Sequence, residues 1–189
     1  MNRQALFLLD PVDVTIYAPE GADYPSACAG LRALGGTGRP LPLAVVGSGL
    51  NDKDCVPPGS NHAAYYDAST APAWEVVVAN SGHFSFVDER GGMMDAICRT
   101  GTAPDAVVRE LSQAMMVAWA EAMVRDPAGS EVRQLKMGLD AGGRVVAGLA
   151  SFDAIQKLFQ TEEAALRLLQ KRAPELQVAM RLKNFELPP

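Results

Sequence analysis

The chain contains 189 residues, of which 48% are hydrophobic and 21% are charged, a composition typical of a folded globular protein. Its net charge of −5 and its pI of about 5.0 argue against nucleic-acid binding, which requires a basic surface. No apolar run approaches the roughly 18–20 residues needed to cross a bilayer, so no transmembrane segment is expected.

In the first half of the chain, apolar runs alternate with segments that contain the turn residues proline and glycine. The runs Ala5–Leu9, Leu43–Val46 and Glu75–Ala79 predict strands, and short helices are expected near Cys28–Ala33 and at Asn61–Asp67. Continuous apolar runs are typical of strands buried on both faces of a parallel sheet. The loops after such strands hold ligands and catalytic groups, so functional residues are expected there.

Two longer helices are expected in the second half of the chain. Pro104–Arg125 is apolar around nearly its whole circumference, which predicts a helix buried against the sheet. In Phe152–Arg172 the apolar residues fall on one stripe and the charged residues on the other side. This pattern favours a surface helix docked on the core, with a lipid-surface or partner-binding helix as the alternative.

Two polar residues that follow predicted strands are candidates for a catalytic acid–base pair. His83 comes after Gly82, just beyond the third apolar run, and Asp10 directly follows the first. A carboxylate there can accept a hydrogen bond from an imidazole, orient the ring and stabilise its protonated form. The alternatives are a structural histidine and an Asp-Pro turn. The order acid then base is the one expected downstream of an α/β-hydrolase serine.

Five segments in series resemble the chlorophyllase family, in its order and at similar spacing. They are Leu8–Asp13, Val45–Leu50, Cys55–His62, Ala73–Trp74 and Gly82–Asp88. The resemblance covers roughly residues 5–140. It implies an α/β-hydrolase fold, with a parallel sheet flanked by helices, and a carboxylic-ester hydrolase with Asp10 and His83 as the acid and base of its triad.

The family's substrate, partners and location follow by the same resemblance. Chlorophyllases hydrolyse the phytyl ester of chlorophyll to chlorophyllide and phytol, so chlorophyll or another lipophilic ester is the expected substrate. The resemblance also implies a chloroplast location and allows peripheral association with a membrane. It implies no cofactor and no metal. The alternative function is that of a non-catalytic remnant that binds pigment, lipid or a partner protein.

The sequence departs from the family in two ways. None of the nine residues before Asp10 is a serine, and Gly47-Ser48-Gly49 does not give the Gly-x-Ser-x-Gly pattern of the nucleophile. We therefore expect residues 1–140 to be the C-terminal portion of the hydrolase domain, truncated before its serine. Residues 141–189, including the helix at 152–172, are expected to be a helical extension and tail, and 141–178 have no counterpart in the family.

Other candidate residues remain open from sequence. Asp52 follows the second predicted strand and is the rival for the triad acid. His62 matches a family position, and a structural or pocket-lining role is expected. The aromatic residues of the site segments are candidates for either a pocket or the core: Trp74, Phe84 and Phe86. The spacing of Cys28, Cys55 and Cys98 matches no metal or redox motif and assigns no disulfide.

Overall fold

The computed structural model describes residues 4–51, 55–89, 96–120, 135–139, 145–149 and 177–183. Its centre is a four-stranded sheet with the order β1-β2-β3-β6. The strands are β1 (Leu6–Leu9), β2 (Leu43–Ser48), β3 (Ala73–Val78) and β6 (Val178–Lys183). The first three are parallel, as the apolar runs predicted, and β6 is antiparallel to β3.

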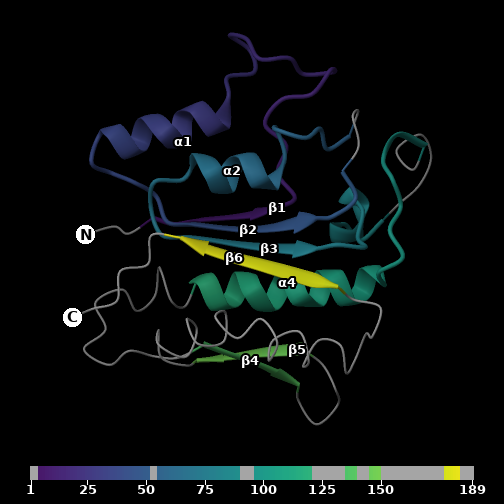
Figure 1. Cartoon of the computed structure of the whole chain (residues 1–189). Helices are drawn as coiled ribbons and strands as arrows, with labels where there is room; N and C mark the ends of the chain where they lie inside the picture. Colours follow the sequence, from purple (N-terminus) through teal and green to yellow (C-terminus); the bar gives the residue numbers. More distant parts are fainter. Residues whose placement is uncertain are drawn as a thin grey trace.

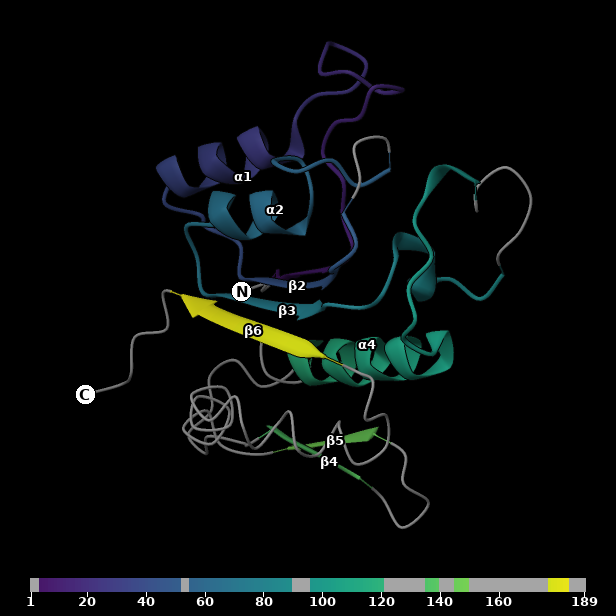
Figure 2. The ribbon, with the colours of Figure 1, turned by 45° about the vertical axis from the view of Figure 1, so that its right-hand side comes forward.

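Helices cover both faces of this sheet (Figure 1). On one face lie α1 (Ala27–Gly36) and α2 (His62–Ala68), and on the other lies α4 (Asp105–Ala120). A separate two-stranded antiparallel sheet, β4 (Leu135–Leu139) and β5 (Val145–Leu149), lies beyond α4 (Figure 2). The described part of the chain is therefore a layered α/β arrangement.

The core lies on both sides of the two central strands. All six residues of β2 are buried, and so are five of the six in β3. Between the sheet and the α1–α2 face, Leu43, Val45, Tyr65 and Tyr66 share one apolar cluster. The helical layers thus bury β2 and β3 on both faces, which accounts for their mostly apolar sequence.

The three strands in the second half of the described chain were not predicted. β6 was not expected from the sequence, nor were β4 and β5. In Val178–Lys183 the apolar residues 178, 180 and 182 alternate with 179, 181 and 183, and this period of two is the signal that a strand carries. The helix expected at 152–172 lies outside the described residues. The division of the chain at residue 140 stays a prediction.

Candidate active site

Asp10 lies at the end of β1 in a backbone conformation that few residues adopt. Its N–H donates to the Val46 carbonyl oxygen at 2.7 Å, and its φ is 39°. Positive φ is uncommon outside glycine, although aspartate tolerates it better than most residues. The side chain is 1% exposed. The backbone therefore turns sharply at Asp10 and directs a buried carboxylate toward the neighbouring strand.

His83 contacts the carboxylate of Asp10 from the turn that follows β3. It begins the 3-10 turn η1 (His83–Phe86), which follows β3 after a short loop. Its Nδ1 lies 2.7 Å from Asp10 Oδ2, and the His83 side chain is 29% exposed. The contact expected between these two residues is present. Because Asp10 accepts at Nδ1, Nε2 is the nitrogen left to exchange a proton with a nucleophile.

Ser48, the last residue of β2, holds the carboxylate from within the sheet. Its backbone N–H donates to Asp10 Oδ1 and its hydroxyl to Oδ2, both at 2.7 Å. Together with His83, Asp10 thus accepts three hydrogen bonds. Ser48 is fully buried and its hydroxyl proton is engaged, so it is not placed to act as the nucleophile. Sequence reasoning missed this orienting role.

Close packing of the loop after β3 fixes the position of His83. A Cβ at Gly82 would lie 2.0 Å from the Arg99 carbonyl oxygen, so only glycine fits there. The Ser85 hydroxyl accepts a hydrogen bond from the Gly82 N–H at 3.2 Å. The next turn is held by α4, where Arg109 donates to the Val87 carbonyl oxygen at 2.9 Å. The loop that carries His83 is therefore held by contacts with Arg99 and with α4.

A disulfide links two segments that flank this region. Cys55 lies in the segment between β2 and α2, and Cys98 in the segment between η1 and α4. The remaining cysteine, Cys28, is buried in α1, and burial together with the nearby Asp13 carboxylate raises its pKa to about 12. A thiol with this pKa stays protonated at neutral pH and is a poor nucleophile.

His62, the first residue of α2, is buried against the face of the sheet at β2 and β3 rather than exposed at the site. Its Nδ1 lies 2.9 Å from Glu75 Oε1 and its Nε2 lies 3.1 Å from the Ser48 carbonyl oxygen. The other Glu75 oxygen accepts a hydrogen bond from Arg181 Nε. Burial alone would raise the pKa of Glu75, but the hydrogen bonds from His62 and Arg181 outweigh it and lower that pKa.

Of the other sequence candidates, one lies outside the described residues and one lies in the core, whereas Phe84 packs edge-on against His83, with ring centroids 5.4 Å apart. Asp52, the rival acid, lies in the undescribed segment 52–54. Trp74 is buried and packs edge-on against Trp119, with ring centroids 4.6 Å apart, so it belongs to the core. Phe84 and Phe86 are partly exposed on η1. Within the described segments, no group of three His, Cys, Asp or Glu residues is arranged to hold a metal ion.

No helix in the part of the chain that the structure describes is long and apolar enough to cross a membrane. Residues 4–141 match the family model described as Chlorophyllase. The chain is also 32% identical over 72 residues to chlorophyllase-2 of Arabidopsis thaliana. That alignment covers 32% of this chain and 23% of the length of the relative.

Proposed function

The chain belongs to the chlorophyllase family, and on that premise we propose that it carries the acid and base of a carboxylic-ester hydrolase, Asp10 and His83. The hydrogen bond of 2.7 Å between His83 Nδ1 and Asp10 Oδ2 is the observation that carries this proposal. The two residues follow β1 and β3, parallel strands whose carboxyl ends lie at the same edge of the sheet. This edge is where open α/β sheets place their active sites.

The proposed mechanism assigns each group one task. Asp10 holds the tautomer of His83 that has its proton on Nδ1, so the Nε2 lone pair can take the proton of a serine hydroxyl. The serine oxygen then attacks the ester carbonyl, and His83 returns the proton to the oxygen of the leaving alcohol. His83 next removes a proton from water, the hydroxide attacks the acyl carbon, and His83 returns that proton to the departing serine oxygen, which frees the acid and restores the serine hydroxyl. Asp10 stabilises the imidazolium at both stages.

The serine is proposed to come from a segment that residues 1–189 do not contain. The sequence has no Gly-x-Ser-x-Gly motif, and Ser48 is committed to Asp10. β1 is the outer strand of the described sheet, and its apolar residues Leu6–Leu9 are only partly buried or exposed, whereas all of β2 is buried. A further strand that pairs with β1 in the parallel direction would cover these residues and bring its own carboxyl end next to Asp10.

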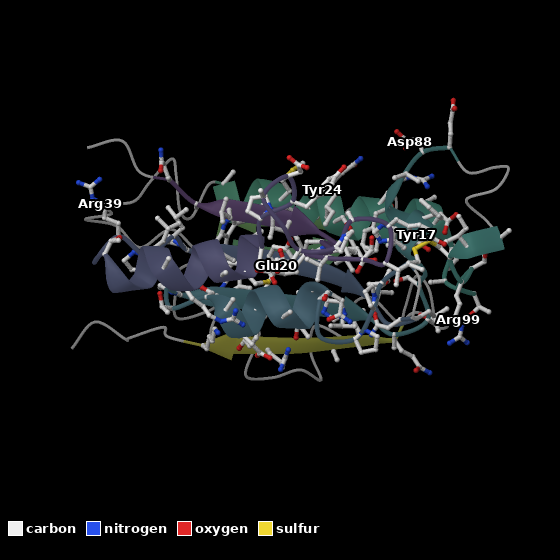
Figure 3. The ribbon with its side chains drawn as sticks, turned by 90° about the horizontal axis from the view of Figure 1, so that it is seen from above. Tyr17, Glu20, Tyr24, Arg39, Asp88 and Arg99 are labelled. Atoms are coloured by element: carbon white, nitrogen blue, oxygen red, sulfur yellow. A yellow bond between two sulfur atoms is a disulfide. The ribbon has the colours of Figure 1, made fainter. Side chains whose placement is uncertain are left out.

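The proposed substrate is the phytyl ester of chlorophyll, hydrolysed to chlorophyllide and phytol. Apolar side chains on the loop that leaves Asp10 support a lipophilic ester: Ile16, Tyr17 and Tyr24 are 66%, 67% and 57% exposed. Figure 3 shows Tyr17 at the same end of the molecule as Asp88 and Arg99, the end to which β1–β3 point in Figure 1. With this substrate the proposed location is the chloroplast, with peripheral association with a membrane.

The test begins with the transcript upstream of the Met1 codon. We expect an in-frame Gly-x-Ser-x-Gly motif there, and we expect the longer product to release chlorophyllide from chlorophyll. His83→Ala in that product should abolish release. Residues 1–189 alone should show no turnover above the buffer rate. Turnover by residues 1–189 that depends on His83 would place the nucleophile inside this chain. Pigment binding by the longer product without hydrolysis would favour a non-catalytic binding protein.

A further inference from the structure

His62 lies where both of its ring nitrogens face hydrogen-bond acceptors. It is the first residue of α2 and is 5% exposed. Nδ1 is 2.9 Å from the carboxylate of Glu75, and Nε2 is 3.1 Å from the backbone carbonyl oxygen of Ser48. A carbonyl oxygen can only accept, and an ionised carboxylate can only accept.

The partners of Glu75 keep it ionised. One of its oxygens faces His62 and the other accepts from Arg181 Nε on β6, directly across the strand pair. These hydrogen bonds lower the pKa of Glu75 despite its burial. A neutral imidazole has a single N–H, so either neutral tautomer of His62 would set a lone pair against an acceptor at hydrogen-bond distance.

We propose that His62 is a buried imidazolium and a positioning residue for Asp10, acting through Ser48. This inference rests on the proposed role of the Asp10–His83 pair. His62 donates to the Ser48 carbonyl oxygen, while the N–H and hydroxyl of the same serine donate to Asp10. The serine is thus fixed on one side by a buried cation and on the other side holds the carboxylate.

The His62 ring is tightly packed against β2. A Cβ at Gly47 would lie 2.2 Å from Cγ of His62, so the ring rests directly on the backbone of β2. The surrounding charged and titratable groups come from three elements: Glu75 on β3, Arg181 and Lys183 on β6, and Tyr66 and Asp67 on α2. Glu75 is the group that contacts the ring, and its two oxygens separate His62 from Arg181.

The charge state is tested by nitrogen-15 NMR of the whole 189-residue chain. The sequence contains two histidines, so His83→Gln removes one set of ring signals and assigns the other. We expect both His62 nitrogens to resonate as protonated nitrogens at pH 7.5, with both ring N–H protons protected from exchange. A single protonated nitrogen would overturn the proposal.

The positioning role is tested by the Nδ1–H signal of His83, which reports the hydrogen bond to Asp10. In Glu75→Gln, His62 loses its carboxylate, so we expect loss of its second proton at pH 7.5 and a shift of the His83 signal. His62→Gln should shift or abolish the His83 signal. Ser112→Ala is the matched control, because this buried serine bonds within α4 to Val108, and it should leave the signal unchanged.

The outcomes separate this inference from the proposed function. A His83 signal unchanged in Glu75→Gln would overturn the positioning role even if His62→Gln fails to fold. Two protons on the His62 ring would support the charge state proposed for His62 even if the longer product hydrolyses no ester. A singly protonated His62 would leave the roles of Asp10 and His83 to be judged by hydrolysis alone.

Discussion

Ser48 holds both oxygens of Asp10, donating its N–H to Oδ1 and its hydroxyl to Oδ2 at 2.7 Å each. These two hydrogen bonds alone fix the orientation of the Asp10 carboxylate, independently of its contact with His83. Charge-assisted hydrogen bonds of this kind contribute roughly 1.5–3 kcal/mol each. Because Ser48 ends β2 and Asp10 follows β1, the pairing of these two strands decides where the proposed acid lies.

Asp10→Asn should remove the proposed acid with little effect on the fold, because asparagine also tolerates positive φ. The amide nitrogen cannot accept from His83 Nδ1, and the ring loses its productive tautomer. In the serine-containing product we expect kcat to fall by a factor on the order of 10⁴ with KM nearly unchanged. Steady-state kinetics with chlorophyll measures this.

The matched control for that variant is Asp13→Asn, which makes the same change three residues away. Asp13 binds the start of α1 and not His83, so kcat should be retained. Equal losses of kcat in the two variants would contradict the role proposed for Asp10.

Gly47→Ala should destabilise the protein and disturb the site. The new Cβ would lie 2.2 Å from the His62 ring, which would have to leave its place between Glu75 and Ser48. Overpacking of this kind costs about 1–3 kcal/mol in the free energy of unfolding. Gly30→Ala is the control, since open space surrounds that helical glycine. It should stabilise the protein by about 0.5–1 kcal/mol. Urea unfolding compares the two, and equal effects would refute the packing argument.

Asp13→Asn should lower the free energy of unfolding by an amount that depends on pH. Burial raises the pKa of Asp13, but hydrogen bonds from Ser26, Ala27 and Cys28 outweigh it, so the pKa lies below the ordinary 3.8. A carboxyl group whose pKa is lower in the folded state than in the unfolded state stabilises the fold at every pH above its unfolded-state pKa. This stabilisation is lost as the pH falls through the folded-state pKa.

We therefore expect Asp13→Asn to cost about 1–2 kcal/mol at pH 7, and the difference from wild type to shrink below about pH 4. Denaturant unfolding at both pH values measures it. Asp23→Asn, on the exposed part of the same loop, should be neutral throughout. If the loss in the free energy of unfolding caused by Asp13→Asn grew toward low pH, the pKa of Asp13 would not be lowered in the folded state.

Reduction of the Cys55–Cys98 disulfide should lower stability by about 2–4 kcal/mol, because the bond closes a loop of 43 residues in the unfolded chain. Thermal or urea unfolding with and without dithiothreitol measures the loss. The double variant Cys55→Ser/Cys98→Ser should match the reduced protein and no longer respond to the reductant. A response that persists in the double variant would point to Cys28 instead.

The centre of the fold and the proposed acid–base pair could be read from the sequence. Apolar runs located β1, β2 and β3, since strands of a parallel sheet covered by helices are mostly apolar. Asp10 and His83 each directly follow such a run or its turn, and a parallel sheet brings these positions to one edge. Local pattern located the strands, whereas the resemblance to the chlorophyllase family singled out Asp10 and His83 among the polar residues that follow them.

Only the tertiary structure decided which distant groups support that pair. The hydroxyl of Ser48, the pairing of Cys55 with Cys98 and the alignment of Glu75 with Arg181, 106 residues later, depend on strand register and loop packing. His62 looks the same in sequence whether it lines a pocket or lies buried as a cation. Hydrophobic periodicity reports which face of an element is buried, but not which side chain lies opposite, because that is fixed only when the layers pack.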